Sequence, residues 1–280
     1  MSLLTVKEIY PDTYQIVDPG IGFGGVNMYL LVGSDKALLI DSGYGALPIM
    51  PVIREITDKE VICVCTHGHL DHALGAAQFS KAYMHSKDQE TFLRHSDSQL
   101  ICAAGTFRLP NLPVPDPIAE DPIQPELVKT MISTRRSVPE PLDGIPVFFL
   151  GNRTVTWRLF PGHTQGSVVF FDMENHVAFD GDSAPLTLWL FLPESTSVTA
   201  YRDELAKYEA FLKTHGIKHR YTGHGDQPIS VESLDWIADA LRNAIEQNTP
   251  SIPFESPFGN AKAYSNTGKN VFVCVPCDCH

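Results

Sequence analysis

The sequence predicts a fold that mixes helices and strands, of the α/β (α+β) class. Two β-sheets are expected to lie between helices within one domain. Three observations predict it. Strand-like segments occur in two successive runs, helical segments accompany each run, and several of the strands are apolar throughout. Continuous apolar strands are typical of sheets that are covered on both faces.

The first run of elements predicts the first sheet. Its expected strands are 5–9, 13–17, 26–32, 37–40, 61–65 and 82–85, and its expected helical segments are 47–56 and 73–79. Glycines around residues 20–25 separate the second strand from the third. The strand at 37–40 ends in Asp41, followed by Ser42 and Gly43, which predicts a turn at that point.

Residues 99–146 differ from both runs. Nine of the 21 prolines lie there. Proline at this density interrupts sheet ladders and long helices, so we expect an irregular insertion with one short helix at 126–132. Long loops in compact domains often act as lids or binding loops. We therefore expect part of this segment to close over a functional site, with a packed decoration as the alternative.

The second run predicts the second sheet. Its expected strands are 147–150, 154–160, 168–172, 176–180 and 220–222. Two helices follow from apolar residues at helical spacing, over 201–212 and 231–245. We expect one domain over residues 1–250 that contains the 99–146 insertion, and a C-terminal tail over 251–280.

Composition argues against several classes of function. The formal net charge is −12, and the longest cluster of basic residues is the pair Arg135–Arg136, so nucleic acid is not an expected partner. No apolar run approaches the roughly 18 residues of a membrane span, and the N-terminus lacks the pattern of a signal peptide. We expect a cytoplasmic protein with no membrane contact. Six cysteines are too few for a disulfide scaffold.

Histidines and carboxylates are concentrated just after the strand at 61–65. His67, His69, Asp71 and His72 are four candidate metal ligands within six positions. Residues two apart point to the same side only on extended chain, so His67 and His69 cannot converge on a helix. The segment therefore predicts a loop at a strand end, with its donors directed to two sides. Such a split suits two metals better than one.

Three later donors stand in similar turns after strands. They are His163 in Pro-Gly-His-Thr, Asp182 in Gly-Asp-Ser and His224 in Gly-His-Gly. Each is a weak signal alone, but the cluster at 67–72 needs further ligands and makes them expected partners. Asp180 and Asp226 are the neighbouring alternatives.

Together these motifs resemble the metallo-β-lactamase fold superfamily. His67, His69, Asp71 and His72 match its His-x-His-x-Asp-His signature. The later single ligands are matched in order by His163, Asp182 and His224, and an early acid after a strand is matched by Asp41. The resemblance covers about residues 13–225. It implies a four-layer αββα sandwich of two mixed β-sheets flanked by helices.

The resemblance also implies a ligand set. His67, His69 and His163 would hold a first metal, and Asp71, His72 and His224 a second. Asp182 would bridge the two metals, and Asp41 would orient ligands by hydrogen bonds. Imidazole and carboxylate ligands suit zinc, with manganese or iron as alternatives.

Such a site predicts a metal-dependent hydrolase of a small molecule. Two divalent metal ions lower the pKa of a shared water, and the resulting hydroxide attacks an ester, thioester or lactone-type carbonyl. Asp71 is also the candidate acceptor of the proton.

Within the superfamily, the resemblance is to the glyoxalase II-like hydrolase branch. True β-lactamases have Cys or Ser where Asp182 stands. The alternative is a mononuclear-iron oxidoreductase of the same fold, similar to a persulfide dioxygenase.

Three further features carry weaker hypotheses. Residues 186–191 are apolar and could wall a substrate pocket. The C-terminal Cys274, Cys277 and Cys279 have a spacing that could bind another metal. We interpret the remaining histidines, His95 among them, as surface or capping residues. The sequence does not determine the oligomeric state.

Overall fold

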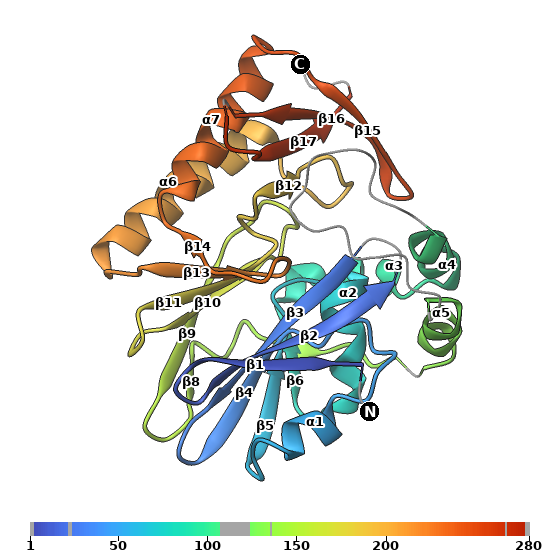
Figure 1. Cartoon of the computed structure of the whole chain (residues 1–280), viewed down its shortest axis with the longest axis vertical. Helices are drawn as coiled ribbons and strands as arrows, with labels where there is room; N and C mark the ends of the chain where they lie inside the picture. The colour runs from blue at the N-terminus through green and yellow to red at the C-terminus, as the bar shows by residue number, and fades with distance from the viewer. Residues whose placement is uncertain (1–2, 22–23, 107–123, 135, 267, 278–280) are drawn as a thin grey trace.

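The computed structural model describes residues 3–21, 24–106, 124–134, 136–266 and 268–277. Two large sheets face each other, helices cover their outer faces, and a small third sheet lies at the C-terminal end (Figure 1). The predicted sandwich of two mixed sheets between helices is confirmed.

The first sheet has the spatial order β1-β2-β3-β4-β5-β6-β7. Pairing is antiparallel from β1 to β4 and parallel from β4 to β7. Its strands are β1 (Thr5–Tyr10), β2 (Thr13–Ile21), β3 (Gly24–Val32), β4 (Lys36–Ile40), β5 (Glu60–Val64), β6 (Ala82–Met84) and β7 (Glu140–Pro141).

The second sheet has the order β14-β13-β11-β10-β9-β8. Only β11 and β13 pair in parallel, and the other neighbours are antiparallel. Its strands are β8 (Val147–Phe149), β9 (Thr154–Leu159), β10 (Val168–Asp172), β11 (Val177–Gly181), β13 (His219–Thr222) and β14 (Ile229–Ser230).

Alternation along the strands divides the interior into layers. On β3, Tyr29 and Leu31 face the second sheet, where they pack with Phe170 and Phe179. Their neighbours Met28 and Leu30 face the opposite way, toward the helices. Both faces of β3 are therefore buried, which explains why its sequence is apolar from Met28 to Val32.

Helices cover the two outer faces (Figure 1). The first sheet is covered by α1 (Met50–Arg54), α2 (Leu70–Ala73), α3 (Gln89–His95), α4 (Ser98–Thr106), α5 (Gln124–Ser133) and the short 3₁₀ turns η1 (Leu74–Gln78) and η2 (Ser86–Asp88). The second is covered by α6 (Val198–Thr214) and α7 (Ser233–Glu246). Ser197 caps α6 by accepting a hydrogen bond from the Ala200 backbone nitrogen.

The predicted C-terminal tail contains three strands. They join a strand from the segment between β11 and α6. The order of this third sheet is β12 (Thr187–Trp189), β17 (Phe272–Pro276), β16 (Gly259–Ser265) and β15 (Ile252–Ser256). One face of it is buried around Phe254 and Cys274, which pack with Phe191 and Leu192 of the segment after β12.

The insertion is more regular than the sequence predicts. The expected helix at 126–132 lies within α5, but α4 replaces irregular chain at 98–106. Ile101 on α4 and Met131 on α5 are both fully buried in the core of the first sheet. Residues 107–123 lie outside the described residues.

No described helix is both long enough and apolar enough to span a lipid bilayer.

Candidate metal centre

The predicted site residues follow the ends of strands from both large sheets. Asp41 follows β4, the segment from His67 to His72 follows β5, and His163 follows β9. Asp182 and His224 follow β11 and β13, which run in parallel. The carboxyl ends of parallel strands meet at one edge of a sheet, and here the edges of two sheets face each other. The structure therefore brings all the predicted ligands to one place.

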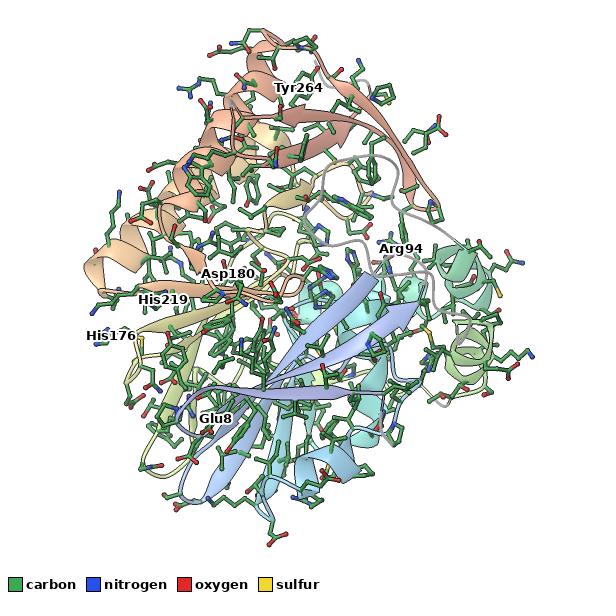
Figure 2. All side chains as sticks on the ribbon, viewed as in Figure 1. Glu8, Arg94, His176, Asp180, His219 and Tyr264 are labelled. Atoms are coloured by element: carbon green, nitrogen blue, oxygen red, sulfur yellow. The ribbon has the colours of Figure 1, made fainter. Side chains whose placement is uncertain are left out.

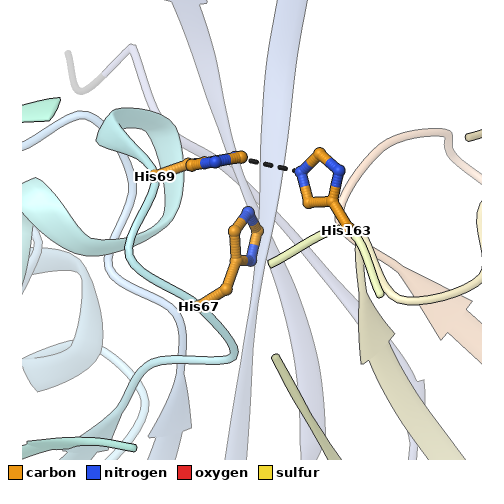
Figure 3. A group of neighbouring side chains, drawn as sticks. All are labelled: His67, His69 and His163. Carbon is orange, nitrogen blue, oxygen red and sulfur yellow. Dashed lines mark hydrogen bonds between the residues drawn. The ribbon is translucent and has the colours of Figure 1, made fainter. Parts of the chain in front are cut away.

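The first group consists of His67, His69 and His163 (Figure 3). Nδ1 of His69 lies 2.9 Å from Nε2 of His163. The His67 ring lies beneath both, with its centroid 4.5 Å from that of His69 and 5.0 Å from that of His163. All three side chains are buried.

The second group consists of Asp71, His72 and His224. The Asp71 carboxylate lies 3.4 Å from Nε2 of His72 and 3.3 Å from Nε2 of His224. Asp182 touches both groups, because its carboxylate lies 3.3 Å from Nε2 of His224 and 3.8 Å from Nε2 of His163.

Hydrogen bonds on the outer side of each ring set the direction of its lone pair. Nδ1 of His163 lies 2.9 Å from the Trp189 carbonyl oxygen, and Nδ1 of His224 lies 2.8 Å from that of Gly25. A carbonyl oxygen only accepts, so both Nδ1 atoms carry hydrogen. In the neutral rings Nε2 then presents a lone pair to the centre.

The other rings follow the same rule with side-chain partners. Nδ1 of His72 donates to Asp41. Nδ1 of His67 lies 3.1 Å from the Thr66 hydroxyl, which itself donates to Asp41. Asp41 therefore orients both rings, and it adopts a left-handed backbone conformation (φ 62°) that non-glycine residues rarely adopt.

The atoms that face the centre lack partners of their own. Nε2 of His67, Nε2 of His72 and Oδ1 of Asp182 are buried and form no hydrogen bond. Buried polar atoms are normally paired, and lone pairs that face each other repel. Cations between them would satisfy both conditions, so this donor set fits bound metal ions.

Electrostatics differ between the two groups. Burial lowers the pKa of His67 well below its usual value and that of His69 to about 3, so both rings stay neutral. Burial alone would lower the pKa of His224 as well. The carboxylates of Asp182 and Asp71 outweigh this effect and raise the pKa of His224 to about 10. Burial would raise the pKa values of Asp71 and Asp182, yet the adjacent histidines hold both well below their usual range. Both acids are therefore ionised at neutral pH.

At Gly223 the loop after β13 passes so close to His72 and Asp182 that only glycine fits. A Cβ atom there would lie 2.4 Å from Cε1 of His72 and 2.5 Å from Oδ1 of Asp182. Any side chain at this position would therefore displace the second group.

Asp88 links the loop that contains His67 and His69 to the loop that contains His163. Its buried carboxylate accepts hydrogen bonds from the Gly68 and Gly166 backbone nitrogens and from the Thr164 hydroxyl. Gly68 lies between two ligands of the first-sheet loop, and Thr164 follows the ligand His163. One carboxylate thus fixes the spacing between loops from different sheets.

The alternative acids lie outside the cluster. Asp180 is fully buried and pairs with Arg220 and Tyr208. Asp226 is exposed at the edge of the cavity.

Sequence reasoning missed two residues of the site. Glu194 is buried behind His69 and accepts from its Nε2 at 2.8 Å. His95, interpreted as a surface or capping residue, is instead buried and stacked on His69 with ring centroids 4.2 Å apart. Neither lies in a local motif, because the contacts join residues far apart in the chain. His85, in contrast, does cap η2.

A cavity of about 800 Å³ opens onto the cluster. Leu186 and Trp189 line it, which agrees with the prediction that 186–191 walls a pocket. The described parts of the insertion do not line it, and the rest of the expected lid, 107–123, lies outside the described residues.

The C-terminal cysteines do not form a ligand group among the described residues. Cys274 is buried in the third sheet, Cys277 is exposed, and Cys279 lies outside those residues.

Comparison with known proteins accords with this geometry. The profile of the metallo-beta-lactamase superfamily matches residues 21–213. The chain belongs to this superfamily. A metallo-beta-lactamase from Pontibacter korlensis has a similar fold, with a TM-score of 0.60 at 15% identity over 86% of this chain and 99% of that one.

Two of the curated relatives that the chain is similar to are named as a thioesterase and as a hydrolase. The acyl-coenzyme A thioesterase MBLAC2 of Gallus gallus is 26% identical over 165 residues, which is 56% of this chain and 56% of that protein. The hydroxyacylglutathione hydrolase GloC of Haemophilus influenzae is 29% identical over 161 residues, 56% of this chain and 65% of GloC. The matched region thus spans less than two thirds of these relatives.

Proposed function

We propose that this protein hydrolyses a small-molecule thioester at a centre of two divalent metal ions, with zinc as the expected metal. The observation that carries the proposal is the common direction of the ligands. Five histidines hold their hydrogens outward on fixed partners, while Asp71 and Asp182 face the same centre.

The arrangement supports two metals rather than one. His67, His69 and His163 would hold the first, and Asp71, His72 and His224 the second, with Asp182 within reach of both groups. Metals bound there would supply Lewis-acid chemistry, acidifying a water molecule and polarising the carbonyl.

The chain's own residues position the reaction. Asp71 lines the cavity in its ionised form and is placed to take the proton that the water gives up. Thr66 and Asp41 keep two rings in the required orientation. A thiolate is a good leaving group, so no side chain needs to protonate it. The thioester assignment rests on the two relatives named for thioester hydrolysis.

The test combines metal analysis with a substrate panel. Protein purified without added metal is expected to carry two zinc ions per chain and to cleave thioesters faster than lactones, phosphodiesters or cephalosporins. His163→Ala is expected to lose metal and activity together. His219→Ala, which removes an exposed histidine at the start of β13 (Figure 2), is the matched control and should change neither. One iron per chain, with no thioester cleavage, would instead favour the mononuclear oxidoreductase.

A further inference from the structure

A buried carboxylate lies behind His69, on the side away from the cluster. Glu194 belongs to the segment between β12 and α6, and it is only 7% exposed. Its Oε1 lies 2.8 Å from Nε2 of His69 and 3.2 Å from Nε2 of His95. Its Oε2 accepts from the Arg94 guanidinium at 2.6 Å, where α3 ends (Figure 2). Both oxygens are therefore occupied by donors.

His69 differs from the other four rings in the nitrogen that it turns inward. His67, His72, His163 and His224 all direct Nε2 at the cluster, and their Nδ1 atoms bond outward. His69 directs Nδ1 inward, 2.9 Å from Nε2 of His163. This ring therefore needs its hydrogen on Nε2, and Glu194 is the acceptor placed there.

Stacking fixes the plane of the same ring. His95 lies nearly parallel to His69, with an angle of 21° between the rings. His95 also stacks on Phe258, at 5.7 Å and 7°, so the third sheet supports the ring from behind. The hydrogen bond and the stack together leave His69 one orientation and one tautomer.

We propose that Glu194 is the positioning residue for His69, holding the hydrogen on Nε2 so that the Nδ1 lone pair faces the first metal. Residues in this role typically change metal affinity by about 10- to 100-fold when removed. Arg94 does not share the role, because its side chain is 45% exposed and contacts only the far oxygen of the carboxylate. The guanidinium also makes this site unsuitable for a third cation. The inference rests on the proposed metal centre.

The test begins with the wild-type, metal-free protein. Nitrogen-15 spectra of the histidine rings are expected to show His69 with hydrogen on Nε2, and a hydrogen on Nδ1 would overturn the inference. Glu194→Ala is expected to weaken zinc binding by about 10- to 100-fold in a competition with a chromophoric chelator.

Two further variants separate positioning from folding. Glu194→Gln keeps an oxygen that can accept from Nε2, so it should recover much of the lost affinity. Arg94→Ala should change affinity little. Unchanged zinc affinity in Glu194→Ala would overturn the inference. If the wild type does not cleave thioesters, that result would instead count against the proposed function. The His69 tautomer and the zinc affinity are measured without substrate, so they test the role of Glu194 separately.

An independent observation concerns the apolar part of the cavity lining. It includes Pro185, Leu186, Trp189, Leu192 and Phe258, of which the last three pack in one cluster. This part adjoins the first group of ligands, since the Trp189 carbonyl oxygen accepts from His163 and Phe258 stacks against His95.

We infer that this apolar lining, called here the acyl wall (Pro185, Leu186, Trp189, Leu192 and Phe258), binds an apolar acyl group of the thioester. This deepens the proposed function and rests on it. Burying a methylene in such a wall favours binding by up to about fourfold. A small or hydroxylated acyl group would leave the wall exposed to water.

The probe is a series of N-acetylcysteamine thioesters from acetyl to octanoyl. We expect kcat/KM to rise with each added methylene, by up to about fourfold. Leu186→Asn and Phe258→Ser should flatten the rise, whereas Phe149→Ser, at an exposed phenylalanine of β8, should not. A flat series in the wild type would overturn the acyl wall, whereas failure to cleave any member would overturn the proposed thioesterase itself.

Discussion

The two halves of the candidate centre are built in different ways. The first sheet contributes four predicted ligands from a single stretch of six residues, His67 to His72. The second sheet contributes three single predicted ligands, His163, Asp182 and His224, from three separate loops. Both halves use strand ends, yet only the first is compact in sequence. The difference shows that sheet pairing, and not local sequence, places the second half.

Specific contacts hold the halves in register. The Val168 backbone nitrogen donates to the Thr66 carbonyl oxygen at 2.8 Å, which ties β10 to the start of the first ligand loop. On the other side, the Asn27 backbone nitrogen donates to the Gly223 carbonyl oxygen, also at 2.8 Å. The centre is therefore a property of the interface between the sheets.

The largest effect is expected from Asp182→Ala, which removes the second-half ligand that reaches both groups. Activity should fall by more than about 100-fold, which exceeds the typical effect of removing a residue that only hydrogen-bonds to a ligand. One or both metals should also be lost. Thioesterase assays and elemental analysis measure this. Asp203→Ala, at an exposed acid of α6 away from the cavity lining, is the control. Full activity with full metal in Asp182→Ala would remove Asp182 from the centre.

The next effect tests the close contact between the halves. In Gly223→Ala the added methyl group would collide with His72 and Asp182. A displacement of about 1 Å should lower activity by about 10- to 100-fold and weaken the second metal more than the first. Gly144→Ala is the matched control, because nothing lies within 4 Å of its Cβ position. Equal activities of the two variants would show that the halves tolerate a wider separation.

Asp88→Ala should reduce stability more than it alters the chemistry. Three donors from the two ligand loops would lose their buried acceptor, at a cost of about 3 kcal/mol or more in the free energy of unfolding. Urea denaturation of the metal-free protein measures this loss. Asp143→Ala, which removes a half-exposed acceptor of Ser86, should cost less than about 1 kcal/mol. Equal losses would mean that Asp88 is no more important than a surface acid.

The smallest effect is expected from Asn27→Ala. The side chain of Asn27 donates to the carbonyl oxygens of Thr222 and Gly225, but its backbone bond to Gly223 would remain. The expected cost is about 1–2 kcal/mol, again from urea denaturation. Asn248→Ala, at an exposed position, should be neutral within error. A neutral Asn27→Ala would show that the backbone contact alone holds this side of the interface.

The same contrast explains what the sequence could predict. A continuous apolar run, as on β3, is a local signal, and so is the dense cluster at 67–72. Helix α4 also had a local signal, since Asp97 accepts from the Gln99 and Leu100 backbone nitrogens at its start. The neighbouring prolines obscured it.

The missed features depend on distant partners. Glu194 follows Pro193 in a short loop, and nothing nearby in the sequence indicates that it faces a histidine 125 positions earlier. The third sheet was missed because its strands are short, two of its ends carry proline, and β12 joins it from across the chain. Such pairings are set by the completed fold.

The stack of Phe258 on His95, and of His95 on His69, ties the turn between β15 and β16 to the candidate metal centre. A fragment trimmed at residue 250 would keep every ligand in its sequence, yet it would expose the edge of β12 and leave one imidazole without its support. Engineering of this protein should therefore keep the C-terminal strands intact, and add tags beyond them.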